Sequence, residues 1–135
     1  MQRDPEPGAT AAVEMVVRDE DTAAALSRIS GDSYPAVFAT TRAIAICELA
    51  AGKILTPLLS PGELSVGVVV DVVHTAATPV GARVKASARY TGRDGRLFVF
   101  EVRVEDPAGE CMRGTHKRGV IEEGRLLAGA AKRGG

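Results

Sequence analysis

The sequence lacks the features that mark several large classes of protein. It contains no tryptophan, only two tyrosines and three phenylalanines, so its core must rely on small aliphatic side chains. Its 17 basic and 17 acidic residues cancel, and no long run of lysine and arginine supports nucleic-acid binding. No apolar stretch approaches the roughly 18 residues of a membrane-spanning helix. We therefore expect a globular protein that binds neither nucleic acid nor a membrane.

Cysteine and histidine are too scarce and too dispersed for a disulfide framework or a metal centre. The two cysteines, Cys47 and Cys111, do not form a C-x-x-C pair, and Cys47 lies in an apolar run that predicts an inert buried thiol. The two histidines, His74 and His116, are far apart and belong to no Cys/His cluster. We expect neither a metal nor a bound cofactor.

The length of 135 residues fits a single domain, which we expect over residues 10–123. Residues 1–9, rich in proline and charge, predict a disordered lead-in without the apolar core of a signal peptide, so the expected location is the cytoplasm. Residues 124–135, rich in alanine, glycine and basic side chains, predict a flexible tail. The 21 alanines make the core lean for its length, which favours support from a partner subunit.

One strong helix prediction runs from Thr40 or Thr41 to about Leu55. A hydroxyl residue at its start can cap the helix, and Pro57 stops it shortly after its end. Its apolar residues recur every three or four positions, which indicates one buried face made of Ile44, Cys47, Ala51, Ile54, Leu55 and Leu58.

The other regular segments have the pattern of strands joined mainly by short turns. A first strand is expected at 12–17, and four more follow the helix at 64–73, 83–90, 97–104 and 111–121. Because no helix is left to connect parallel strands, the sheet must be antiparallel. One helix cannot cover both faces of five strands, so we expect an α+β fold with the sheet curled round the helix. A second subunit often closes the open edge or face of such a sheet.

Glu48 lies on the apolar stripe of the predicted helix, together with Ile44 and Ala51. A carboxylate in such a stripe is costly to bury unless it is protonated, paired or used. Two interpretations stay open: Glu48 lies at the margin of the stripe and reaches solvent, or it is a site carboxylate. Thr41 projects on nearly the same side of an ideal helix as Glu48, and either Thr40 or Thr41 could be an N-cap or a site hydroxyl.

His74 is the best candidate for a general base, because histidine titrates near neutral pH. It ends the valine-rich strand, where a lone histidine can equally be structural or solvated. We interpret His116, in the last strand, as structural. Gly67 interrupts the valine-rich strand, where it predicts either a bulge or a place at which a ligand approaches a backbone N–H.

Three segments carry motifs that belong together: Val37 to Thr40 with Glu48 further on, the H-T-A-A-T-P run from His74 to Pro79, and Gly114 to Ile121. Over roughly residues 33–122 they resemble the fluoroacetyl-CoA thioesterase family. The resemblance implies the hot dog fold, in which a curved antiparallel five-stranded sheet wraps one long central helix. It also implies a homodimer that hydrolyses an acyl-CoA substrate.

The resemblance further implies roles for individual residues. Thr40, Glu48 and His74 correspond to the family's catalytic threonine, carboxylate and histidine, which favours Thr40 over its neighbour. Gly67 falls where a backbone N–H helps to hold the thioester carbonyl, and Arg118 falls where a basic side chain contacts CoA. Thioester hydrolysis needs a nucleophile, a base that activates it and a donor for the developing oxyanion, and this set can supply all three.

The segment ahead of the helix departs from the family pattern. Residues 18–35 predict a long connection that acts as a lid or is otherwise functional, and its large rings are only Tyr34 and, just beyond it, Phe38. A less enclosed pocket accepts other acyl groups, so we expect a small acyl-CoA, fluoroacetyl-CoA or another. Two alternatives share the fold: an acyl thioester hydratase or dehydratase, and a non-catalytic acyl-CoA-binding dimer.

Overall fold

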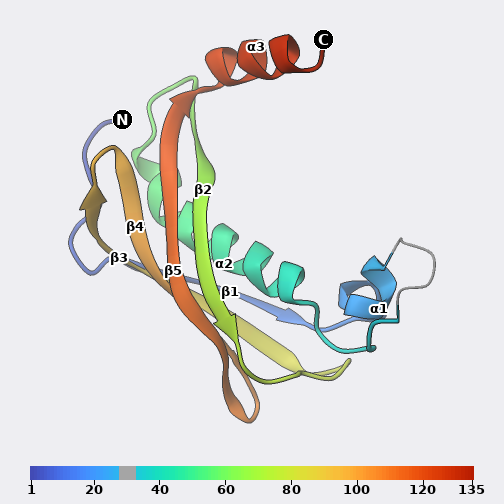
Figure 1. The fold of residues 1–135 in the computed structure, drawn as a ribbon. Coiled ribbons are helices and arrows are strands. Elements are labelled where there is room, and N and C mark those ends of the chain that lie inside the picture. The colour runs from blue at the N-terminus through green and yellow to red at the C-terminus, as the bar shows by residue number, and fades with distance from the viewer. Residues whose placement is uncertain (28–32) are drawn as a thin grey trace.

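The computed structural model describes residues 1–27 and 33–135. Five strands in these ranges form one antiparallel sheet in the order β1-β3-β4-β5-β2, so β1 and β2 lie at its edges. Figure 1 shows that the sheet curves around one long helix. The strands are β1 (Thr10–Val16), β2 (Glu63–His74), β3 (Arg83–Asp94), β4 (Leu97–Asp106) and β5 (Gly109–Glu122).

Three helices accompany the sheet in the described part of the chain: α1 (Ala23–Leu26), α2 (Thr40–Leu55) and α3 (Glu123–Arg133). A 3₁₀ turn, η1 (Asp19–Asp21), precedes α1, and a second, η2 (Thr56–Leu58), follows α2. The long helix in the curve of the sheet is α2, whereas α3 leaves the end of β5 and projects away from the sheet (Figure 1). None of the helices in the described ranges is long and apolar enough to cross a membrane.

The core lies between α2 and the inner face of the sheet. The helix meets the sheet with small side chains, of which Ala43, Ala50 and Ala51 are completely buried. Because alanine adds little bulk, the helix backbone packs close to the strands. The strands supply the larger groups, since every second residue of β4 points inward and is buried: Phe98, Phe100, Val102 and Val104.

The predicted central helix and all five predicted strands are present, and their ends differ from the prediction by no more than four residues. The cap of α2 differs. Its N-cap is Ala39, which makes no side-chain hydrogen bond, so the expectation that a hydroxyl residue caps the helix is wrong. Thr40 is instead the first helical residue, and its hydroxyl bonds elsewhere.

Both termini differ from the sequence-based expectation. The expected flexible tail forms the helix α3, whose glycines weaken the helical pattern in the sequence. The lead-in, expected to be disordered, contacts the domain: the Met1 amino group lies 2.6 Å from Glu63 Oε1, and the Gln2 N–H donates to the Leu58 carbonyl at 2.9 Å. Between β1 and α2, the expected loop contains η1 and α1.

The edge strand β2 is irregular in its middle. Its register with β5 shifts between Gly67 and Val69, which leaves Val68 as the extra residue of a β-bulge. The bulge that the glycine predicts is therefore confirmed. Three valines of this strand, Val68, Val70 and Val73, are exposed.

Candidate active site

The entry to α2 is held against the loop that follows β2. The Phe38 N–H donates to the Thr78 carbonyl at 2.8 Å, and Val37 forms an isolated β-bridge with Pro79. Thr78 is completely buried, and its hydroxyl donates to the Asp106 carboxylate at 2.7 Å. The H-T-A-A-T-P run thus fixes the first turn of α2 beside the carboxyl end of β2.

At this junction Thr40 meets His74. The Thr40 Oγ1 lies 2.8 Å from His74 Nδ1, so the hydroxyl and the imidazole are in direct hydrogen-bond contact. The other ring nitrogen, Nε2, is buried and has no hydrogen-bond partner among the described residues. A buried polar atom without a partner is rare and marks a place where a water molecule or a further group belongs. This pair can therefore hold and move a proton.

Glu48 lies further along α2 and meets a different set of groups. Its Oε1 is 3.4 Å from Arg118 Nη1 and 3.8 Å from His116 Nε2. A Cβ atom on residue 67 would collide with Glu48 Oε1 and come within 3.3 Å of His116 Cε1. The space beside Gly67 is therefore filled by this carboxylate, and the approach of a ligand to the Gly67 N–H stays a prediction.

His116 is almost completely buried, and both of its ring nitrogens are bonded. Arg118 carries only donors, so the 3.1 Å contact from its Nη1 makes His116 Nε2 an acceptor. The proton is then on Nδ1, which donates to the Val69 carbonyl at 2.8 Å. Burial lowers the pKa of His116, and the neighbouring guanidinium lowers it further. His116 is a neutral imidazole in this arrangement.

Arg118 is anchored from the strand opposite it. Its Nε donates to Ser65 Oγ at 3.1 Å and its Nη2 donates to the Ser65 carbonyl at 3.0 Å. Only 11% of the side chain is exposed, and this burial lowers the pKa of the guanidinium, whereas Glu48 opposes the shift. The contact with CoA that the family resemblance implies for Arg118 stays a prediction.

The predicted set of Thr40, Glu48 and His74 does not come together within one chain. Thr40 and Glu48 are eight residues apart on one helix, which separates them by about 12 Å along its axis. Thr40 and His74 form one group, whereas Glu48 forms another with His116 and Arg118.

Sequence reasoning missed Ser65 and the site contact of His116. The signal that could have found the histidine is alternation, because residues 116 and 118 of one strand project from the same face.

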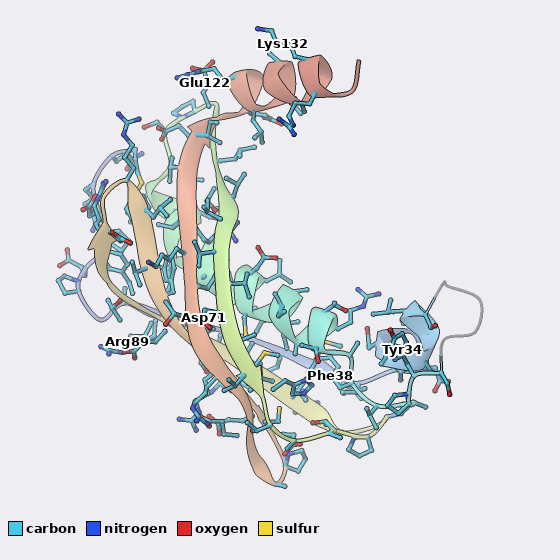
Figure 2. The ribbon with its side chains drawn as sticks, in the orientation of Figure 1. Tyr34, Phe38, Asp71, Arg89, Glu122 and Lys132 are labelled. Atoms are coloured by element: carbon cyan, nitrogen blue, oxygen red, sulfur yellow. The ribbon has the colours of Figure 1, made fainter. Side chains whose placement is uncertain are left out.

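The two residues expected to form a lid differ in their exposure to solvent. Phe38 is 1% exposed and belongs to the core, whereas Tyr34 is 55% exposed. Figure 2 shows Tyr34 beside α1 and Phe38 at the entry to α2. The rest of the expected lid falls partly on residues 28–32, which lie outside the described residues.

Both cysteines are buried free thiols. Burial raises the pKa of Cys47 to about 12, and it also raises the pKa of Cys111. The prediction of a buried Cys47 thiol is confirmed, and the raised pKa disfavours the thiolate, which is the reactive form.

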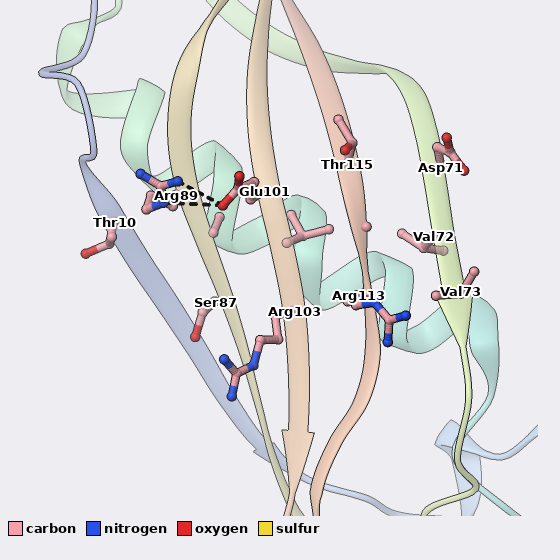
Figure 3. Close-up of a pocket in the computed structure, with 13 residues that line it drawn as sticks. Thr10, Asp71, Val72, Val73, Ser87, Arg89, Glu101, Arg103, Arg113 and Thr115 are labelled. Carbon is pink, nitrogen blue, oxygen red and sulfur yellow. Dashed lines mark hydrogen bonds and ion pairs between the residues drawn. The ribbon is translucent and has the colours of Figure 1, made fainter.

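A hollow of about 640 Å³ lies on the opposite face of the sheet, and none of the predicted site residues lines it. Figure 3 shows three arginines there, Arg89, Arg103 and Arg113, with the strands between them and α2. Arg89 lies 3.0 Å from Glu101, and the other two lie 3.6 and 3.0 Å from Glu110. Each of these guanidinium groups is thus paired with a carboxylate of the chain. Because the predicted site residues lie on the inner face of the sheet, we assign the candidate site to that face.

Comparison with solved structures identifies the class of protein. The chain matches the solved structure of the fluoroacetyl-CoA thioesterase FlK with a TM-score of 0.89 and 31% identity, over 96% of this chain and 98% of that one. It also matches a hot-dog-like protein from Thermanaerovibrio acidaminovorans with a TM-score of 0.81 and 23% identity, over 96% and 93%. The predicted α+β hot dog fold is confirmed.

The chain belongs to the fluoroacetyl-CoA-specific thioesterase family, whose sequence profile matches residues 17–124. It is also similar to the fluoroacetyl-CoA thioesterase of Streptantibioticus cattleyicolor, with 40% identity over 88 residues. That match covers 65% of this chain and spans 63% of the relative's length. The resemblance inferred from the motifs is therefore confirmed at the level of the family.

Proposed function

We propose that this protein hydrolyses a small acyl-CoA thioester to the free acid and CoA. The observation that carries the proposal is the Thr40–His74 pair, whose buried Nε2 lacks a partner among the described residues. Membership of a thioesterase family supports the same reaction. We also propose that the reaction takes place in the cytoplasm, as expected from the sequence.

The proposed chemistry uses the groups on the inner face. Attack on the thioester carbonyl forms a new C–O bond, the C–S bond then breaks, and the leaving thiolate takes up a proton. In direct hydrolysis water attacks the carbonyl, His74 or Glu48 accepts its proton, and Thr40 orients either the imidazole or the water. In the covalent alternative the Glu48 carboxylate attacks and forms a mixed anhydride as the thiolate leaves, and water that gives its proton to His74 then hydrolyses the anhydride to the free acid and Glu48. The backbone N–H of Gly67 is the proposed donor to the oxyanion.

We propose that the active protein is a homodimer, because the predicted catalytic residues form two separate groups within one chain. Thr40 and His74 make one group, and Glu48 belongs to the other. The edge strand β2 supports this, since a long edge with exposed valines can pair with another strand. Antiparallel pairing of two copies of β2 about Val70 and Asp71 would set Gly67 opposite His74 of the partner subunit. Glu48, which packs on Gly67, would then reach the Thr40–His74 pair across the interface.

We propose a short acyl group without restricting it to fluoroacetyl. The two fluoroacetyl-CoA thioesterases named above act on fluoroacetyl-CoA according to their names. In this chain Tyr34 is exposed and Phe38 is packed in the core, so neither ring encloses the acyl group in the single chain. Acetyl-, fluoroacetyl- and propionyl-CoA are therefore all substrates to test.

The test is release of free thiol from this panel of acyl-CoAs. We expect turnover by the unmodified protein and losses of about 10²- to 10⁴-fold in kcat for Glu48→Gln and His74→Ala, with a loss for Thr40→Ala as well. Wild-type rates in all three variants would contradict the site assignment. Loss of the enoyl absorbance of crotonyl-CoA without release of thiol would instead favour a hydratase, and binding without turnover would favour a binding protein.

A further inference from the structure

Almost all N–H donors of the Arg118 guanidinium make hydrogen bonds within the protein. A guanidinium has five N–H donors. Its Nε–H donates to Ser65 Oγ, one Nη2 hydrogen donates to the Ser65 carbonyl, and the two Nη1 hydrogens point to Glu48 and His116. Four donors are thus used by the chain itself, which leaves a single N–H for any ligand.

The contacts of Arg118 with Ser65 and His116 direct its guanidinium towards Glu48. Ser65 fixes the guanidinium at two points on β2, and His116 accepts a hydrogen bond from the same Nη1 that faces the carboxylate. Gly67 leaves the space that Glu48 Oε1 occupies. The carboxylate is 39% exposed, so one side of it is held by this network while the other is open for chemistry.

We propose that Arg118 is a positioning residue for Glu48, with Ser65 and neutral His116 setting the direction of its guanidinium. This inference rests on the proposed function and replaces the contact with CoA that the family resemblance implies for Arg118. The physical reason is mutual: a half-buried carboxylate needs a fixed counter-charge, and a buried guanidinium needs an acceptor with negative charge. Removal of either group leaves the other without its partner.

The experiment compares two thioesters of the same acyl group, one on CoA and one on N-acetylcysteamine, which lacks the nucleotide and its phosphates. For Arg118→Gln we expect kcat to fall by about 10- to 100-fold with both substrates, because the carboxylate is displaced by about an ångström. We expect KM for the acyl-CoA to change by less than about threefold. A loss confined to the CoA thioester, and found mainly in KM, would overturn the proposal.

A double-variant cycle tests whether Arg118 acts through Glu48. If it does, Glu48→Gln with Arg118→Gln is no slower than Glu48→Gln alone, because the second change has nothing left to misplace. Multiplication of the two losses would overturn the proposal. Arg118→Lys keeps the charge without the planar fork, and we expect it to recover part of the lost kcat.

Ser65→Ala keeps the inference testable if Arg118→Gln fails to fold. It removes one anchor of the guanidinium without changing any charge, and we expect a loss of about threefold in kcat with both thioesters and an unchanged KM. An unchanged kcat in this variant would count against the proposal. The proposed function fails separately, if the unmodified protein does not hydrolyse any acyl-CoA of the panel.

Discussion

The two histidines lie on neighbouring strands of one sheet and differ in their hydrogen bonds. His74, at the end of β2, uses Nδ1 for Thr40 and leaves a buried Nε2 without a partner among the described residues. His116, in the middle of β5, uses both nitrogens within the chain. A histidine with an open nitrogen can take up a proton from a reacting group, whereas one with both nitrogens bonded can only hold its neighbours.

The largest expected effect separates these two histidines. We expect His74→Gln to lower kcat by about 10³-fold, because glutamine cannot act as a general base. We expect His116→Gln to lower kcat by only about tenfold, because an amide can still accept from Arg118 and donate to the Val69 carbonyl. The measurement is steady-state hydrolysis of the preferred acyl-CoA, and equal losses would show that the comparison is wrong.

Gly67→Ala tests the group formed by Glu48, His116 and Arg118, because Gly67 leaves the space that the Glu48 carboxylate occupies. The new methyl group would collide with Glu48 Oε1, so the carboxylate must turn away, and we expect kcat to fall by about 10- to 100-fold. Gly52 is the matched control, because a methyl group there meets nothing within 4 Å on α2. Gly52→Ala should keep full activity and raise stability by up to about 1 kcal/mol. A fully active Gly67→Ala would contradict the close approach.

His116 also predicts a dependence of stability on pH. Burial lowers its pKa in the folded protein, whereas the unfolded chain keeps a value of about 6.5. Between these two values the unfolded state binds more protons, so the free energy of unfolding falls as the pH drops below about 6.5. Urea unfolding at about pH 7.5 and about pH 5 measures this loss. We expect the loss to be smaller in His116→Gln, and an equal loss in both proteins would exclude His116 as its source.

The smallest expected effect concerns the loop beyond His74. Thr78→Val keeps the shape of the buried side chain but removes the hydrogen bond to Asp106, which is the main reason why the pKa of that carboxyl is lowered. We expect a loss of about 1 kcal/mol in stability, or about 4 °C in Tm. Activity at 25 °C should stay within about twofold. An unchanged Tm would show that this bond does not support the junction.

The sequence predicts the fold better than it predicts the contacts of the site. The central helix and the five strands follow from apolar periodicity, which is a local property of the chain. The partner of each histidine depends instead on strand register, and no local pattern shows that His116 lies opposite Val70. For the same reason the sequence groups Glu48 with His74, whereas within one chain Glu48 lies beside His116.

The caps and termini were mispredicted for a different reason. The hydroxyl of Thr40 has a good local use as a cap, yet the bond to His74 takes it, which only the tertiary structure reveals. The glycines of α3 lower the helix propensity of this segment, so the sequence does not predict the helix that follows β5.

The bulge in β2 has a further consequence for the spacing of the site. Gly67 and His74 are an odd number of residues apart, so in a regular strand their side-chain positions would project from opposite faces of the sheet. With Val68 as an extra residue, they stand opposite Arg118 and Met112, which project from one and the same face of β5. Deletion of Val68 would turn either half of β2 inside out and send its site residue to the outer surface. A single inserted valine thus determines that Gly67 and His74 face the same side of the sheet.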